Sequence, residues 1–445
     1  MGVRTASKIN VTLISLGCAK NLVDSEIMLG ALKAARYAFV ADPKDADIVI
    51  VNTCGFIRPA REEAEEIIEK LIRQKARRPD QRLVVTGCYV ARDRALLKKA
   101  FPEVDTWLGV GAFDRIADVV QGGPFKEPER TFLYDHRHPR LLSTPSGSAY
   151  IKISEGCSHG CSFCAIPLIK GRYRSRTVSS VMNEARAMAG LGIREINLIS
   201  QDTTFFGRDR GVQDGLVRLL QKLVGVKGIE WIRILYGYPE EITDGLLEIF
   251  LEDKICPYLD IPFQHAEKKI VRAMRRGKYG ASALGLIEKI RARVPDIALR
   301  TSLIVGFPGE GAAEFHVLKQ FVRDARFEHL GVFTYSHEPG TPAHKKDDRL
   351  TQEEKERRRD DIMEIQAEIS LAHNRALVGA MADVLVEKPW KEEGCFLGRT
   401  RHQAPEVDGV LALDARGFGW VKPGTVVKAR ITEADVYDLR GKLIP

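Results

Sequence analysis

Three cysteines stand close together in the segment 155–164, with the spacing C-x3-C-x2-C: Cys157, Cys161 and Cys164. Structural zinc sites and ordinary iron–sulfur sites take four protein ligands. Three thiolates can hold three corners of a cubane iron–sulfur cluster and leave the fourth iron open to a reacting molecule. A zinc knuckle or a chance group of buried thiols is the alternative reading, but no fourth Cys or His with zinc spacing stands nearby.

A second set of three cysteines, Cys18, Cys54 and Cys88, is spread roughly 35 residues apart in sequence. Each follows a short apolar run that predicts a buried parallel strand, at 11–16, 46–52 and 82–86. The carboxyl ends of parallel strands share one edge of a sheet, where open α/β folds bind ligands. The helix that follows each strand also points its N-terminus at that edge, which favours a thiolate. Three small apolar side chains packed at strand ends are the alternative.

Strands alternating with helices at 24–35 and 58–77 predict an open α/β sheet over residues 8–122. A Gly- and Pro-rich stretch at 123–147 predicts a linker.

A second α/β region, 148–350, has six predicted strands separated by helical stretches. The strands are expected at 149–154, 195–200, 231–236, 258–262, 299–305 and 330–335. Six βα units are too few to close an eight-stranded barrel, so we expect an open-sided partial TIM barrel. The C-x3-C-x2-C loop follows the first of these strands, at the face where such barrels place their chemistry.

The C-terminal part begins with a predicted helix over 351–377, opened by a capping box at Thr351 and Glu354. We expect this helix to bridge to a small five-stranded β-barrel over 378–445.

The chain has 445 residues, 44% hydrophobic and 29% charged, with a net charge of +8 and a pI near 9.0. This length predicts two or three domains. The basic charge suits a phosphate-rich partner such as a ribosome, although solvated helix faces would give the same total. No run resembles a transmembrane span or a signal peptide, and eight cysteines without such a signal suggest metal ligands in a reducing, cytoplasmic setting.

Both cysteine sets and the terminal barrel together resemble the radical S-adenosylmethionine methylthiotransferase family along the whole chain. Four runs resemble its RimO branch, the ribosomal protein S-twelve aspartate methylthiotransferases: GCAKNLVDSE at 17–26, LISQDTT at 198–204, GVFTYS at 331–336 and APEVDG at 404–409. The terminal barrel then corresponds to a TRAM domain.

The resemblance implies two 4Fe–4S clusters. Cys157, Cys161 and Cys164 would hold the one that reduces S-adenosylmethionine to a 5′-deoxyadenosyl radical, and Cys18, Cys54 and Cys88 an auxiliary cluster that carries the transferred sulfur. We expect both clusters to face one chamber. Cys256 and Cys395 belong to neither set and are interpreted as packing residues.

Beyond the ligands the assignments are fewer. By resemblance Phe163 would flank the adenine, and the turn at Gly306 would line the nucleoside; a core aromatic and an ordinary strand–helix connection are the alternatives. His265 could be polar lining or structural. Gln201 and Asp202 end a barrel strand and face the reactive edge. No side chain beyond the cluster ligands is assigned a catalytic role.

The implied reaction replaces a C–H bond by C–SCH3 at the β-carbon of an aspartate of ribosomal protein S-twelve, with two S-adenosylmethionine molecules per product. The partners would be that protein and an electron donor such as flavodoxin or ferredoxin, with no membrane. The alternative enzyme modifies adenosine 37 of transfer RNA, and a third reading is a non-enzymatic metalloprotein that binds ribosomes. Residues 378–445 carry ten acidic and ten basic side chains, a neutral balance that favours a protein substrate over nucleic acid.

Overall fold

The computed structural model describes residues 9–122, 125–128, 132–277 and 283–444. The chain divides into two compact units. Unit 1 comprises Met1–Ser143, Ser154–His159 and Cys164–Arg176; unit 2 comprises Thr144–Ile153, Gly160–Phe163 and Thr177–Pro445. The predicted linker over 123–147 lies partly outside the described residues. The flanks of the C-x3-C-x2-C loop therefore group with unit 1, although the sequence places the whole loop in the predicted 148–350 range.

Unit 1 contains the predicted open parallel sheet, with strand order β2-β1-β3-β4-β5. Its strands are β1 (Asn10–Ser15), β2 (Ala38–Phe39), β3 (Ile48–Thr53), β4 (Arg82–Gly87) and β5 (Thr106–Leu108). All six residues of β3 are buried, as expected for a central strand covered by helices on both faces. The three predicted strands are confirmed to within two residues.

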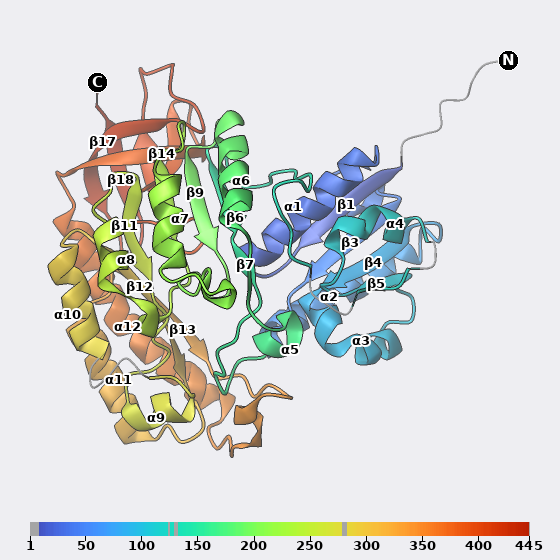
Figure 1. Ribbon diagram of the computed structural model, residues 1–445, viewed down its shortest axis with the longest axis horizontal. Coiled ribbons are helices and arrows are strands. Elements are labelled where there is room, and N and C mark those ends of the chain that lie inside the picture. The colour runs from blue at the N-terminus through green and yellow to red at the C-terminus, as the bar shows by residue number, and fades with distance from the viewer. Residues whose placement is uncertain (1–8, 123–124, 129–131, 278–282, 445) are drawn as a thin grey trace. The chain divides into compact units, whose positions relative to one another are not determined.

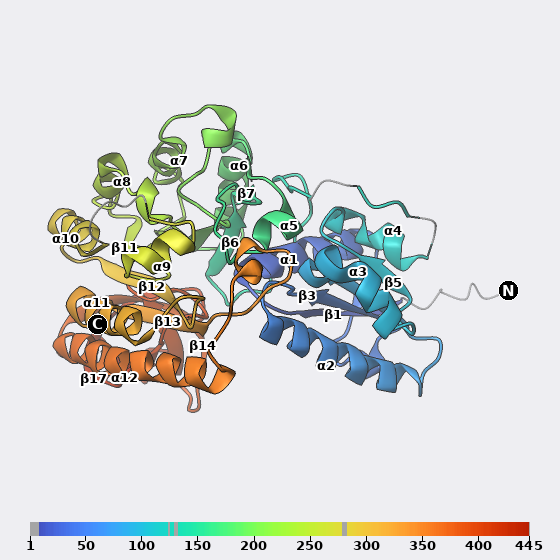
Figure 2. The same ribbon diagram turned by 90° about the horizontal axis from the view of Figure 1, so that it is seen from below.

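Helices cover both faces of this sheet. The helices of unit 1 are α1 (Ala19–Ala34), α2 (Arg58–Lys75), α3 (Cys88–Ala100), α4 (Ile116–Val120) and α5 (Ile166–Lys170). One apolar core joins α1, α4 and α5 to the sheet, and another joins α2 and α3 to its opposite face. Figure 2 shows α1 and α2 on opposite sides of β1 and β3.

The start of α1 was misplaced by the sequence pattern. The helix begins at Ala19 rather than at residue 24. The sequence pattern missed this start because the first two turns bury polar side chains, among them Asn21, Asp24 and Glu26. An apolar period of 3.6 residues is absent from such a stretch, so the pattern gives no signal.

Unit 2 contains a six-stranded sheet in the order β13-β12-β11-β10-β9-β6, with every neighbouring pair parallel. The strands are β6 (Ser148–Lys152), β9 (Glu195–Ile199), β10 (Trp231–Ile234), β11 (Ile255–Asp260), β12 (Ala298–Val305) and β13 (His329–Thr334). The helices between them are α6 (Val178–Gly190), α7 (Gly215–Leu223), α8 (Asp244–Ile249), α9 (Lys268–Ala273), α10 (Ala283–Arg293) and α11 (Ala312–Ala325). This is the predicted partial barrel (Figure 1).

A helix and a closed barrel are also found where the sequence predicts them, while the bridging role of the helix stays a prediction. Helix α12 (Gln352–Ala376) is capped by Thr351, whose side chain accepts from the Glu354 backbone N–H at 3.2 Å. The Glu354 carboxylate pairs with Arg357 and Arg358. The closed barrel has the order β14-β15-β16-β18-β17. Its strands are β14 (Met381–Pro389), β15 (Cys395–Thr400), β16 (Leu411–Asp414), β17 (Val426–Ala434) and β18 (Leu439–Leu443).

A buried ionic joint fixes the terminal barrel to the six-stranded sheet. The Glu195 carboxylate at the start of β9 accepts from Arg399 of β15 at 2.5 Å and from Arg233 of β10 at 3.0 Å. All three side chains are 1% exposed or less. Ser148 donates to the same carboxylate at 2.8 Å. Two guanidinium groups and one hydroxyl thus donate to the Glu195 carboxylate and replace the water that it loses on burial.

Asp408, in the run APEVDG, makes a second joint. Its carboxylate accepts from the Tyr258 hydroxyl at 2.7 Å, from Arg300 at 2.5 Å and from the Ala404 backbone at 2.8 Å. A side chain at Gly409 would place a Cβ 1.8 Å from the Tyr437 carbonyl oxygen, so only glycine fits there.

These joints lie at the amino edge of the parallel sheet. Besides Glu195, the barrel contacts include Arg401 to the Ile255 carbonyl at 2.7 Å and His329 to the His402 carbonyl at 2.8 Å. Ile255 and His329 begin β11 and β13. In Figure 1 the barrel lies at the end of unit 2 from which the β9 arrow points away. The terminal barrel thus sits at the edge opposite the strand ends that lead into the cysteine loop.

No helix among the described residues is long and apolar enough to cross a bilayer.

Replacing Glu195 by Gln is expected to destabilise unit 2 by about 3 kcal/mol, because two buried guanidinium groups lose their shared counter-charge. The shift in guanidinium chloride midpoint measures this. The matched control is Asp414→Asn, which removes an exposed pair with Arg416 and should cost less than about 0.5 kcal/mol. Equal midpoints for the two variants would contradict the assignment.

The same joint predicts a pH dependence. Burial acts to raise the pKa of Glu195, but Arg399 and Arg233 outweigh burial and lower the pKa from 4.5 to about 2. The stabilisation is therefore complete above the unfolded pKa and is lost as the pH falls from 4.5 toward 2. The Glu195→Gln variant should lack this loss of stability as the pH falls from 4.5 toward 2, and acid unfolding followed by circular dichroism would measure the difference.

Candidate metal centres

The first cysteine set converges at one edge of the unit 1 sheet. Cys18 is the N-cap of α1, Cys54 follows β3, and Cys88 opens α3 directly after β4. Their strands β1, β3 and β4 are neighbours in the sheet. The predicted delivery of three cysteines to one carboxyl edge is what the backbone shows.

Close backbone approaches bring these residues together. A Cβ at Gly17, which has φ +89°, would lie 2.7 Å from the Cys54 Cβ and 3.2 Å from its Sγ. A Cβ at Gly55 would lie 2.9 Å from the Cys88 carbonyl carbon. The two glycines therefore let the cysteine-bearing turns pack against one another without an intervening side chain.

Asn21 organises this edge from the first turn of α1. Its Nδ2 donates to the Leu16 and Thr53 carbonyls, each at 3.0 Å, and its Oδ1 accepts from Cys88 Sγ at 3.5 Å. Asn52 in turn donates to the Asn21 carbonyl at 2.9 Å. The sequence pattern missed Asn21; its only signal is a polar residue three positions after a cysteine at a helix start.

Burial works against the thiolates that the helix N-termini were expected to favour. Burial, with a smaller effect of the nearby Cys18, raises the pKa of Cys54. Burial raises the pKa of Cys88 to about 12, although the Lys170 ammonium acts to lower it. Desolvation thus opposes the thiolate form of Cys54 and Cys88, and the expected preference from the helix ends stays a prediction. A bound cation would lower the pKa of both thiols and so favour the thiolates.

In residue type, both sets of cysteines match the thiolate ligands of an iron–sulfur cluster. All eight cysteines are free thiols, and the three strand-end cysteines are graded in exposure from Cys18 outward to Cys88 inward. Within the described ranges no group of three or more His, Cys, Asp or Glu is arranged to hold a metal ion. Ligands of a single tetrahedral zinc have sulfurs about 4 Å apart, whereas a cubane spreads its irons over four corners, so that its thiolate ligands stand further apart. The preceding finding therefore concerns a single metal ion.

The cysteines of the second set are divided between the two units, and each unit supplies contacts to its own part of the loop. Cys157 and Cys164 belong to unit 1, where the Cys157 backbone donates to the Gly171 carbonyl at 3.1 Å. Cys161 belongs to unit 2. There its neighbour Ser162 donates to the Met274 and Ala273 carbonyls at 2.9 and 2.8 Å and accepts from the Ala343 backbone. The loop is thus pinned to the end of α9.

A buried lysine ties the flanks of this loop to the first sheet within unit 1. Lys170, at the end of α5, is 3% exposed and lies 3.1 Å from Asp24 of α1 and 3.5 Å from Glu155. Burial acts to lower the pKa of Lys170, but the two carboxylates outweigh burial and raise it. Glu155 precedes Cys157, and Lys170 lies near Cys88. Five of the six predicted ligands therefore share one compact unit.

Phe163 and the turn after Gly306 come together in unit 2. Half-buried Phe163 packs against a cluster that contains Ile270, Met274 and Phe307. Gly306 has φ +77° and donates to Glu310 at 3.0 Å. A Cβ there would meet the Lys355 side chain at 2.4 Å. Contact of either residue with a nucleoside stays a prediction.

The remaining polar candidates have structural contacts. His265 is fully buried: its Nδ1 accepts from the Glu267 backbone at 3.0 Å, so Nε2 carries the proton toward Glu310 at 3.2 Å. Asp202 accepts from the Thr204 and Phe205 backbones at 3.0 and 3.2 Å. Cys256 is buried in β11, and Cys395 opens β15.

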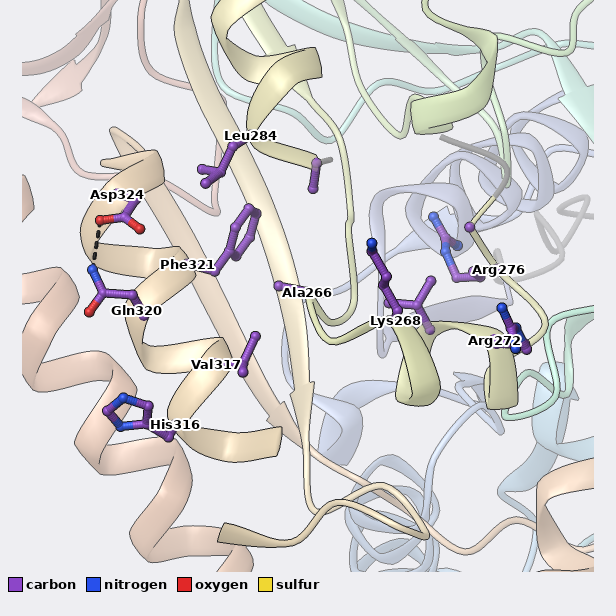
Figure 3. A pocket seen from close by; sticks show the side chains of 13 residues that line it. Ala266, Lys268, Arg272, Arg276, Leu284, His316, Val317, Gln320, Phe321 and Asp324 are labelled. Atoms are coloured by element: carbon purple, nitrogen blue, oxygen red, sulfur yellow. Dashed lines mark hydrogen bonds between the residues drawn. The ribbon is translucent and has the colours of Figure 1, made fainter. Parts of the chain in front are cut away.

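A cavity of about 470 Å³ lies between α9, α10 and α11 (Figure 3). Its lining includes Lys268, Arg272, Arg276 and Phe321, and none of the lining residues that the structure describes is a cysteine. The cavity lies outside the cysteine sites, although Arg276 both lines the cavity and donates toward Cys161 Sγ.

The fold and the cysteine loop define a radical S-adenosylmethionine protein. Residues 151–322 match the model described as "Radical SAM superfamily", residues 10–109 match "Uncharacterized protein family UPF0004", and residues 378–444 match "TRAM domain". A solved structure of the radical S-adenosylmethionine methyltransferase TsrM from Kitasatospora setae, with cobalamin and a 4Fe–4S cluster, has a TM-score of 0.54 at 14% identity. It covers 84% of this chain and 80% of that one, which shows the fold alone.

Full-length relatives then give the family. A ribosomal protein uS12 methylthiotransferase RimO of Syntrophus aciditrophicus is 45% identical over 98% of both chains. That of Geotalea uraniireducens is 43% identical over 99% of this chain and 100% of its own. The chain belongs to the RimO family of methylthiotransferases, which confirms the predicted family and enzyme class.

Replacing Lys170 by Met is expected to destabilise unit 1 by about 3 to 5 kcal/mol, because it leaves two buried carboxylates without their cation. Denaturation followed by tryptophan fluorescence and proteolysis would measure the loss. Arg58→Met is the matched control, since Arg58 and Glu62 form an exposed pair on α2. A Lys170→Met variant as stable as Arg58→Met would show that the ion pairs of Lys170 with Asp24 and Glu155 contribute nothing to the stability of unit 1.

Proposed function

We propose that the chain adds a methylthio group to the β-carbon of an aspartate of ribosomal protein uS12, using two 4Fe–4S clusters and two S-adenosylmethionine molecules per product. The reaction class follows the RimO family. The two-cluster part is carried by one observation: Cys18, Cys54 and Cys88 converge at one sheet edge, in the same compact unit as Cys157 and Cys164.

Six cysteines would hold the clusters, Cys157, Cys161 and Cys164 one and Cys18, Cys54 and Cys88 the other. When bound, the two groups would supply one-electron cleavage of S-adenosylmethionine and the sulfur that is transferred. The β-carbon of an ionised aspartate is too weak a carbon acid for any side-chain base, so cofactor chemistry is required.

The protein's own contribution is position and exclusion of water. Asn21 fixes three loop segments at the first cysteine set through its hydrogen bonds. Lys170 joins Asp24 to Glu155 and so holds the second loop's flanks against α1. Phe163 and the Gly306 turn would bind the nucleoside, with Phe163 at the adenine.

The uS12 substrate is favoured over transfer RNA. The full-length relatives above are named for uS12, and the neutral TRAM barrel lacks the net positive charge that sequence-independent phosphate binding uses. A ribosomal-protein substrate supports a cytoplasmic location for the reaction. The reductant would be a low-potential flavin or iron–sulfur protein such as flavodoxin or ferredoxin.

Anaerobic incubation with S-adenosylmethionine, dithionite and uS12 should add one methylthio group to an aspartate, detected by peptide mass spectrometry. A parallel reaction with adenosine-modified transfer RNA should give no product. Transfer to the RNA alone would overturn the substrate assignment.

Alanine at Cys18 or at Cys157 should abolish the product and lower the iron content, which is about eight atoms per chain for two clusters. Cys395→Ala is the matched control and should keep both iron and activity, since Cys395 lies on the terminal barrel. Full activity of the reconstituted Cys18→Ala variant would rule out the auxiliary cluster.

A further inference from the structure

Cys161 lies in a polar environment built from three strand ends of unit 2. Arg276 donates from Nη1 toward Cys161 Sγ at 3.8 Å. The Tyr238 hydroxyl is a second hydrogen-bond partner of the same sulfur. One predicted cluster ligand thus has a cation and a phenol directed at it.

Arg276 is held in this position by three separate contacts. Its Nη2 donates to the Pro262 carbonyl, just beyond β11, at 2.7 Å. Its guanidinium lies 4.3 Å from the centre of the Tyr238 ring, within range of a cation–π interaction. Its backbone N–H closes the end of α9 by donating to the Val271 carbonyl at 2.9 Å. Figure 3 shows Arg276 on the segment that follows this helix.

Tyr238 is positioned just as firmly from the neighbouring strands. Its backbone N–H donates to Thr204 Oγ1 at 3.0 Å, and Thr204 in turn donates to Asp202 at 2.5 Å. Asp202 follows β9, and Tyr238 follows β10. This gives the run LISQDTT a role in unit 2: its acidic residue orders the loop that presents the tyrosine.

Hydrogen bonds and positive charge at a cluster's sulfurs stabilise the more negative, reduced state more than the oxidised state, and so raise the reduction potential. We infer that Arg276 and Tyr238 are positioning residues that raise the potential of the cluster held by Cys157, Cys161 and Cys164, through Cys161 Sγ. The inference rests on the proposed function, which makes Cys161 a ligand.

The electron balance is simple. One electron passes from a low-potential donor, dithionite in the test and a flavin or iron–sulfur protein in the cell, to the oxidised cluster. No bond to Arg276 or Tyr238 forms or breaks, and both keep their protons. Their effect is on how strong a reductant the cluster requires.

The test is a redox titration of the reconstituted full-length chain, followed by electron paramagnetic resonance, with the signal assigned by its response to S-adenosylmethionine. In Arg276→Gln the ratio of reduced to oxidised cluster at a fixed potential should fall about tenfold, a shift of about 59 mV for one electron. Tyr238→Phe keeps the ring under Arg276 and removes only the hydroxyl; it should shift the potential in the same direction by less.

Arg272→Gln is the matched control, because it removes an equal charge from the neighbouring turn of α9, where Arg272 is exposed. It should leave the ratio nearly unchanged. Equal shifts in Arg272→Gln and Arg276→Gln would overturn the inference in favour of a general charge effect. If Arg276→Gln does not fold, Tyr238→Phe decides.

Failure of the inference and failure of the proposed function differ in outcome. A wild-type chain that binds no iron overturns both. A wild-type chain with full iron and product, whose Tyr238→Phe and Arg276→Gln variants keep the wild-type potential, overturns the inference alone.

Discussion

The buried Lys170 ammonium between Asp24 and Glu155 is the interaction on which the candidate site depends. Asp24 lies on α1, Glu155 stands two residues before Cys157, and Lys170 ends α5, the helix after Cys164. A cation in such a place stabilises the fold only because two carboxylates replace its lost water. The same contacts bring the flanks of the C-x3-C-x2-C loop into the unit that carries Cys18, Cys54 and Cys88.

Desolvation determines the acidity of the cysteines at the edge of the unit 1 sheet. The thiols of Cys54 and Cys88 are made weaker acids by burial, so the edge of the sheet is a poor place for free thiolates and a good one for thiolates bound to iron. Asn21 and the glycines Gly17 and Gly55 hold the cysteine-bearing segments close before any metal arrives. In the proposed function, a bound iron–sulfur group would supply the positive charge that favours these thiolates.

The sequence was sufficient for the architecture and for the convergence of the strand-end cysteines. Short continuous apolar runs located the strands of the first parallel sheet, because burial on both faces is what such runs record. The same logic missed the first turns of α1, the pairing of Glu195 with Arg399, and the donors Arg276 and Tyr238. The last two sets of contacts join polar residues from 77 to 204 positions apart, and no local periodicity encodes them. Such contacts are where the site acquires its electrostatics.

The terminal barrel is locked to the amino edge of the parallel sheet by Glu195 and Asp408, while the Cys161 loop follows the opposite edge. An affinity handle or surface linker placed after β18 would accordingly be attached on the amino-edge side of the unit 2 sheet. A C-terminal tether is therefore the sensible design for capture experiments, because it leaves the edge of that sheet next to Cys161 unattached.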